Sequence, residues 1–393
     1  MAKYMDYLCE NYPHISFKRN WDIKDSMFML GECKAMIDAI SFLPCSPEKM
    51  HKLLKVSLIK GAMATTAIEG NTLSEEEVAD VYEGKKFEAS REYLEKEVKN
   101  VIDALNTILN DVLVEDRDDY ISVDLICSYH KMIGKGLGEN FASIPGKIRE
   151  NNVHVGTYRP PNYEYLPDIM QKFCLWLKEE FGYKQDQEQN FIDNIVESIV
   201  AHAYIAFIHP FGDGNGRTAR MIEFYLLLRG CLPNICSHLL SNHYNNTRSE
   251  YYRQLENATK RRDLSDFIRY AVMGLRDGLA LQLAALQRHQ LEGAWKNYIY
   301  DVAENWRVAE KRRKRMSIMV SHMNIFDEYH LNNITSCHPD TVREYAKLTP
   351  TILTRDIDFL LEEKILIKKE KGYSVNIGVL LSNLPDRRTI RQK

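Results

Sequence analysis

The stretch that decides the fold reads His209-Pro210-Phe211-Gly212-Asp213-Gly214-Asn215-Gly216-Arg217-Thr218-Ala219-Arg220. An apolar run over residues 199–208 precedes it, and a second apolar run over residues 221–228 follows it. Apolar runs of this kind predict two buried helices, and the glycines between them predict a tight turn. The sequence therefore predicts that these polar side chains sit on a turn between two buried helices.

The residue types of this turn point to phosphate chemistry. A glycine-rich turn that opens a helix leaves backbone N–H groups unpaired at the positive end of the helix dipole, where an anion can bind. Arg217 and Arg220 are three residues apart, so they project from neighbouring parts of one helix face and can hold phosphate oxygens bidentately. Asp213 can hold Mg²⁺ beside a phosphate, and His209 can accept a proton from a hydroxyl near neutral pH. An ordinary surface turn is the alternative, but it makes this set of residue types a coincidence.

The same stretch matches every defining position of the signature His-x-Phe-x-(Asp/Glu)-Gly-Asn-Gly-Arg-x-x-Arg, and so it resembles the Fic (filamentation induced by cAMP) family. Most members of that family are adenylyltransferases that move AMP from ATP to a protein hydroxyl. The resemblance covers roughly residues 50–275. It implies that His209 is the general base, that Phe211 anchors the loop and that Asp213 binds Mg²⁺. It also implies phosphate-binding roles for Gly214, Asn215, Gly216, Arg217 and Arg220.

The residue after the acidic position separates two branches of this family. Relatives that act as kinases carry a residue other than glycine there, whereas this chain has Gly214. The resemblance therefore favours transfer of a nucleotidyl group over transfer of a phosphoryl group.

A second motif, Thr65-Thr66-Ala67-Ile68-Glu69-Gly70-Asn71, ends a predicted helix. It resembles the inhibitory motif (Ser/Thr)-x-x-x-Glu-(Gly/Asn) of the Fic family, which implies inhibitory roles for Thr65 and Glu69. By that resemblance Glu69 pairs with Arg220 and competes with the γ-phosphate of ATP. Since the motif precedes the core, the resemblance implies the class II arrangement of that family. The alternative is a helix end with a solvated glutamate.

Length and composition indicate a globular protein of more than one unit. The chain has 393 residues, of which 45% are hydrophobic and 27% are charged, and its net charge of -3 gives no global attraction to nucleic acid or to an anionic membrane. Its eight cysteines form no Cys-x-x-Cys pair, which favours free thiols in the cytoplasm over disulfides or a zinc site. We expect no signal peptide and no apolar run of membrane-spanning length.

Apolar spacing predicts a mainly α fold, a Fic-type helical bundle with a β-hairpin flap. Helices are expected over residues 27–43, 48–68, 75–84, 92–113, 122–133, 166–181, 191–207 and 264–289, after an irregular arm over residues 1–20. We expect His130 to be a packed or hydrogen-bonded residue rather than a catalytic one. Short alternating runs predict the hairpin near residues 152–163, where a Fic-type flap would align a target by β-augmentation. An ordinary surface hairpin is the alternative.

The end of the chain has three short helical patterns followed by two short strands, which resembles a winged helix-turn-helix. The helix over residues 350–363 would be its recognition helix, but Asp356 and Asp358 on it would repel DNA phosphates. Both DNA binding and protein binding by this segment stay open. We divide the chain into an N-terminal helical region with the inhibitory motif (1–110), a catalytic core (111–290), a connecting helix (291–315) and a winged-helix-like domain (316–393).

The function expected from the sequence is ATP- and Mg²⁺-dependent adenylylation of a Ser, Thr or Tyr hydroxyl on a target protein, with Glu69 as an inhibitor. Self-modification and a homodimer are left open, and no membrane partner is expected. Two other functions remain: a de-AMPylase in which Glu69 positions the attacking water, and a DNA-binding regulator whose core senses nucleotide.

Overall fold

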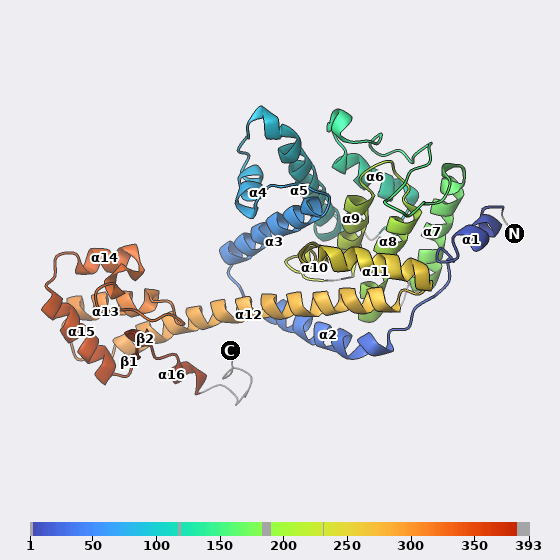
Figure 1. The fold of residues 1–393 in the computed structure, drawn as a ribbon. Coiled ribbons are helices and arrows are strands. Elements are labelled where there is room, and N and C mark those ends of the chain that lie inside the picture. Colours follow the sequence, from blue (N-terminus) through green and yellow to red (C-terminus); the bar gives the residue numbers. More distant parts are fainter. Residues whose placement is uncertain (1–2, 117–118, 183–189, 231, 383–393) are drawn as a thin grey trace. The chain divides into compact units, whose positions relative to one another are not determined.

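The computed structural model describes residues 3–116, 119–182, 190–230 and 232–382. The chain divides into two compact units, Met1–Leu283 and Ala284–Lys393 (Figure 1). The helices of unit one are α1 (Lys3–Asn11), α2 (Met27–Phe42), α3 (Pro47–Ala67), α4 (Glu75–Tyr82), α5 (Glu92–Leu113), α6 (Val123–Ile133), α7 (Leu166–Phe181), α8 (Phe191–Ile208), α9 (Asn215–Arg229), α10 (Leu239–Asn246) and α11 (Arg248–Arg261). Helix α12 (Ser265–Ala303) begins in unit one and ends in unit two.

Helices α8 and α9 form the centre of unit one (Figure 1). α8 packs along α9, α7 covers α8, and α9 also contacts α3, α5 and α6. Every residue of α9 except Gly216 is buried. A helix that is enclosed on all sides holds its side chains in fixed positions, so the turn between α8 and α9 lies on a rigid base.

The apolar length of α8 corrects one expectation from the sequence. By length and composition this helix could cross a membrane, with a mean hydropathy of 1.5, so the expectation that no apolar run reaches that length is wrong. However, 78% of the helix is buried inside the structure. Its apolar surface is therefore used for packing against its neighbours in unit one.

The predicted helices of unit one are confirmed within a few residues, except that the helix expected over residues 264–289 continues to Ala303. The irregular arm predicted over residues 1–20 is wrong for residues 3–11. Residues 3–11 form α1, whose Leu8 is only 1% exposed. Tyr7 of this helix stacks on Tyr165, with ring centroids 4.3 Å apart. These tertiary contacts stabilise a nine-residue helix that is too short to form by its own propensity.

The segment predicted as a hairpin is shorter than expected. Its only antiparallel bridge among the described residues joins Val155 and Tyr158, through two backbone hydrogen bonds of 2.9 Å. Pro160 and Pro161 follow, and proline has no N–H group to donate to a ladder. The segment is therefore a tight turn around Gly156, whose φ of 58° is in the left-handed region, rather than two paired strands.

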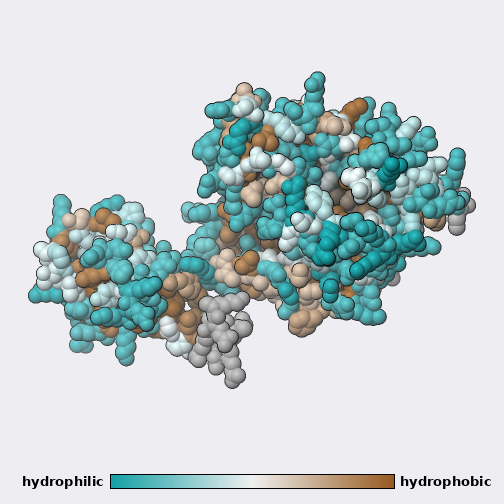
Figure 2. All heavy atoms as spheres, in the orientation of Figure 1, coloured by the Kyte–Doolittle hydropathy of each residue, from teal (hydrophilic) through white to brown (hydrophobic). Residues whose placement is uncertain are grey.

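Figure 2 shows a largely hydrophilic surface over α11 in the same unit.

Unit two contains the end of α12 and the elements α13 (Glu310–His322), α14 (Pro339–Tyr345), α15 (Pro350–Glu362), β1 (Leu366–Lys368), β2 (Tyr373–Val375) and α16 (Gly378–Leu381). Strands β1 and β2 are antiparallel, with Leu366 opposite Val375. The hydrophobic core of unit two includes Trp295 of α12, Met319 of α13 and Leu360 of α15. The predicted order of helices and strands is present, whereas the winged-helix assignment itself stays a prediction.

The connecting helix predicted over residues 291–315 is wrong as a separate element. α12 continues to Ala303, and the basic run over residues 310–315 opens α13. Two arginines of this run pair with Asp356. Its fully buried carboxylate accepts hydrogen bonds from Arg312 at 2.7 Å and from Arg315 at 2.6 Å. The two arginines therefore hold α13 against α15.

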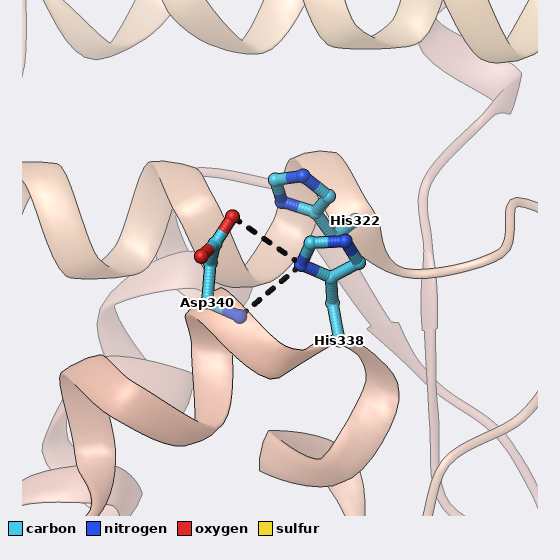
Figure 3. A group of neighbouring side chains, drawn as sticks. All are labelled: His322, His338 and Asp340. Carbon is cyan, nitrogen blue, oxygen red and sulfur yellow. Dashed lines mark hydrogen bonds and ion pairs between the residues drawn. The ribbon is translucent and has the colours of Figure 1, made fainter.

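Three side chains of types that can ligate a metal lie together where α13 meets α14: His322, His338 and Asp340 (Figure 3). The two imidazole rings stack with centroids 3.9 Å apart. Nδ1–H of His322 donates to the carbonyl of Ile318 at 2.8 Å, and Nδ1 of His338 accepts the backbone N–H of Asp340 at 3.2 Å. Hydrogen bonds at the two helix ends therefore account for this group, and we assign no metal to it.

Candidate active site

The turn between α8 and α9 is held by its own asparagine. The side chain of Asn215 accepts the N–H of Phe211 and donates to the carbonyl of Phe211, both at 2.9 Å. Asn215 is buried, so this pair of bonds closes the turn without help from water. The asparagine side chain braces the loop, and the backbone N–H groups at the start of α9 remain the candidates for binding an anion.

His130 of α6 packs against the turn and hydrogen-bonds to it, which confirms the prediction that it is a packed, hydrogen-bonded residue. Its ring stacks on Phe211 with centroids 3.7 Å apart and planes within 3°. Nδ1 accepts the N–H of Gly146, so Nε2 carries the proton and donates to the carbonyl of Asp213 at 2.9 Å. Burial lowers the pKa of His130 to about 4, which keeps this neutral form at physiological pH. A Cβ at Gly214 would lie 2.9 Å from Phe141, so the turn packs closely on this support.

His209 ends α8 in a left-handed conformation, with φ of 52°. Its Nδ1–H donates to the carbonyl of Ala206 at 3.3 Å, which leaves the lone pair on Nε2. Burial lowers the pKa of His209 to about 4, and the positive charge of Arg149 adds to the shift. The imidazole is therefore neutral near pH 7 and can accept a proton at Nε2.

Arg149 joins the turn to the segment that was predicted as a flap. Its guanidinium donates to the carbonyl of His209 at 2.9 Å, to that of Asn151 at 2.7 Å and to that of Pro161 at 2.5 Å. Its backbone N–H also donates to the carbonyl of Pro210 at 2.9 Å. One arginine thus fixes the position of the Val155–Tyr158 turn relative to His209.

Asp213 and Arg217 lie together at the start of α9. Nη2 of Arg217 donates to Oδ1 of Asp213 at 2.7 Å, and Nη1 forms a short ion pair with Glu97 of α5. The side chains of Arg217 and Glu97 are 3% and 4% exposed, and burial raises the pKa of Glu97 against the opposing charge of Arg217. The other oxygen of Glu97 accepts the side-chain N–H of Asn71 at 2.8 Å.

Arg220 is fully buried and pairs with the end of α3. Its Nη2 donates to Oε1 of Glu69 at 2.5 Å and to the backbone carbonyl of Thr65 at 2.9 Å. Burial would raise the pKa of Glu69, but the charge of Arg220 outweighs it, so the pKa lies below its usual value. A Cβ at Gly216 would lie 2.3 Å from Oε1 of Glu69, which places that carboxylate directly over the first turn of α9.

Three guanidinium N–H groups near this turn are buried and lack a protein acceptor: Nε of Arg217, and Nε and Nη1 of Arg220. A buried donor without an acceptor costs roughly 1–3 kcal/mol, and more when it is charged. Phosphate oxygens are the acceptors that arginine binds most readily. The donors therefore fit a site for a polyanion at the start of α9.

The structure thus brings all the site residues predicted from the sequence to one place: Thr65, Glu69, His209, Asp213, Gly214, Asn215, Gly216, Arg217 and Arg220. Glu97, His130 and Arg149 were not assigned to the site. Glu97 lies one residue before Val98 on the apolar stripe of its helix, and a charge at that position was the one available signal. Nothing in the local sequence of Arg149 reveals that its partners are carbonyls of the turn and the flap.

Comparisons with known proteins agree with this geometry. Residues 120–227 match the model of the Fic/DOC family. The chain is 32% identical over 221 residues to the protein adenylyltransferase fic-1 of Caenorhabditis elegans, covering 56% of this chain and 40% of that protein. It is 27% identical over 243 residues to the protein adenylyltransferase Fic of Nematostella vectensis, covering 62% of this chain and 52% of that protein.

Solved structures of similar fold include Fic-1 of C. elegans, with 25% identity, a TM-score of 0.53 and coverage of 66% of this chain and 72% of that one. A Fic family protein of Desulfovibrio desulfuricans G20 has 19% identity and a TM-score of 0.54, and the match covers 94% of this chain and all of that one. The chain spans 40% to 52% of the length of the two curated relatives above. The comparisons thus identify residues 120–227 as a domain that matches the Fic/DOC family.

Proposed function

We propose that this chain is a protein adenylyltransferase, which transfers AMP from ATP to a Ser, Thr or Tyr hydroxyl of a target protein. The observation that carries the proposal is the assembly of a neutral imidazole, His209, with two arginines whose buried N–H groups lack protein acceptors. The names of the curated relatives support the same chemistry.

In this proposal Nε2 of His209 accepts the proton of the target hydroxyl. The hydroxyl oxygen forms a bond to the α-phosphorus while the bond to the leaving pyrophosphate breaks. Arg217, Arg220 and the N–H groups at the start of α9 bind the phosphate oxygens, where negative charge must be stabilised during the transfer. Arg149 keeps the Val155–Tyr158 turn beside His209, where it can align a target segment.

Asp213 is the residue that fits Mg²⁺. Its side chain is 31% exposed, and the N–H that approaches its Oδ2 oxygen, from Ala142, is 3.4 Å away, so this oxygen remains available to a cation. Bound Mg²⁺ would neutralise charge on the phosphates.

We further propose that Glu69 inhibits the resting protein. Its carboxylate holds Arg220 and lies over the first turn of α9, both of which a phosphate group would need. An anion already bound there competes with ATP, so release requires that the end of α3 moves away. The Thr65 carbonyl contributes to the same restraint on Arg220.

The remaining functions stay predictions. Removal of AMP would use the same side chains, with Glu69 positioning a water molecule. For a DNA-binding regulator, the pairing of Arg312 and Arg315 with buried Asp356 leaves those two guanidinium groups engaged inside unit two.

The proposal is tested by incubating the Glu69→Gly protein with ATP, Mg²⁺ and a cell extract, followed by peptide mass spectrometry. We expect peptides that carry AMP on a hydroxyl side chain, from other proteins or from the chain itself. The same experiment with Glu69→Gly/His209→Ala should give none. AMP-modified peptides at equal yield in both would show that His209 is not the base.

A further inference from the structure

The ion pair between Glu97 and Arg217 is buried. Both side chains are at most 4% exposed, and they come from positions 120 residues apart, on α5 and α9. Removing one partner of such a pair leaves an uncompensated charge, so the guanidinium of Arg217 has little freedom to leave Glu97. One half of its fork is thereby fixed on Glu97, and the other half is aimed at Asp213.

Glu97 is itself held by Asn71. The side-chain N–H₂ of Asn71 donates to Oε2 of Glu97 at 2.8 Å and to the carbonyl of Leu94 at 3.0 Å. Its oxygen accepts the N–H of Leu73 at 3.0 Å. These three partners fix the orientation of the amide, and they leave the second oxygen of Glu97 for Arg217.

We propose that Glu97 is a positioning residue for Arg217, and that Asn71 ties it to the inhibitory segment. Asn71 follows Glu69 by two residues, so the same short segment contacts Arg220 directly and Arg217 through Glu97. The end of α3 therefore sets the geometry of both arginines in the phosphate site. This inference rests on the proposed use of Arg217 to bind the phosphates of ATP.

The positioning role predicts a loss that is selective for the triphosphate. When Glu97 is neutral, Arg217 retains its charge but loses the partner that fixes its orientation. Binding of ATP, which needs both arginines, should weaken, while binding of AMP should change little. If Glu97 only supported the fold, its substitution would lower the stability of the protein or weaken the binding of ATP and AMP equally.

The test measures the dissociation constants of ATP and AMP by isothermal titration calorimetry with the full chain. The parent is Glu69→Gly, in which Arg220 is released from the carboxylate of Glu69, and Glu97→Gln is added to it. We expect the ATP dissociation constant to rise about tenfold, the equivalent of losing one charge-assisted hydrogen bond, with the AMP constant within about twofold of the parent. Asn71→Ala in the same parent should give a smaller rise, of about threefold, and it serves if Glu97→Gln fails to fold.

Glu197→Gln is the matched control. Glu197 pairs with Arg229 at 2.8 Å, with side chains 5% and 2% exposed, and that pair also joins α9 to a neighbouring helix. This variant should lower the melting temperature and leave the ATP constant unchanged.

Equal ATP affinity in folded Glu97→Gln and its parent would overturn the inference, and so would an equal loss for ATP and AMP. A parent that binds ATP but transfers no AMP would refute the proposed function alone. A parent that binds no ATP would refute both.

Discussion

Replacing Glu69 by glutamine changes only the charge of the carboxylate that faces Arg220. The side chain of Arg220 is fully buried, and the N–O distance in the pair is 2.5 Å. A hydrogen bond to a charged group contributes roughly 1.5–3 kcal/mol, about twice the contribution of a neutral one. Because the Glu69 side chain is 28% exposed, we take the lower end of this range, about 1.5 kcal/mol. Glutamine keeps a neutral hydrogen bond of about half that strength, so the substitution weakens the pair by about 0.7 kcal/mol.

ATP must displace Glu69 from Arg220 in order to bind there. The free energy that the pair loses in Glu69→Gln should therefore appear as tighter binding of ATP. An energy of about 0.7 kcal/mol corresponds to a roughly threefold lower dissociation constant. Isothermal titration calorimetry of ATP with the wild type and Glu69→Gln measures it. Glu180→Gln is the control, because Glu180 forms only an exposed pair with Arg19. A change of less than about twofold for Glu69→Gln would show that the carboxylate does not compete with ATP.

Three further outcomes are expected. Burial lowers the pKa of His14, His130 and His209 to about 4, so below pH 6.5 the unfolded chain binds more protons than the folded chain. The free energy of unfolding, measured by chemical denaturation, should therefore be highest above pH 6.5 and fall as the pH drops towards 4. A free energy of unfolding that rises on acidification would contradict these shifts. Arg149→Lys removes two of the three carbonyl contacts of the guanidinium, so it should lower protein labelling in the Glu69→Gly background at least fivefold while ATP affinity stays within twofold; equal losses of both would remove the flap-positioning role. Asp356→Asn leaves Arg312 and Arg315 facing a neutral side chain and should destabilise unit two by about 3 kcal/mol in urea unfolding, whereas Asp358→Asn on the same helix should change little.

The sequence predicts the α8–α9 centre because its two apolar runs flank a turn rich in glycine. Local periodicity also predicts α3 and α5 well, since each has one apolar stripe and a clear end. The pairing of Glu69 with Arg220 was expected only through the family resemblance, because residues 151 positions apart carry no local signal of their contact.

The errors have physical causes in tertiary contacts. Helix α1 forms because Leu8 and Tyr7 find partners in the folded core, which no window of local sequence contains. The hairpin shrinks to one bridge because two prolines remove the donors that a longer ladder needs. The basic run over residues 310–315 looks solvated in the sequence, but Arg312 and Arg315 are held by a single buried aspartate.

Glu97 shows why the second layer of a site is hard to predict. A glutamate in a charged amphipathic helix normally faces water, and only its place beside the apolar stripe distinguishes this one. Its two partners, Asn71 and Arg217, come from separate segments of the chain. The fold is needed to bring them together.

The central claim, that the site transfers a nucleotidyl group from ATP under the control of Glu69, is tested most directly by position-specific labelling. Glu69→Gly protein is incubated with Mg²⁺ and a cell extract, in parallel with ATP labelled on the α-phosphate or on the γ-phosphate, and the protein-bound label is measured. The account predicts label from the α-position only, dependent on His209 and higher than in the wild type. Protein-bound label from the γ-position only, or none from either position, would contradict it.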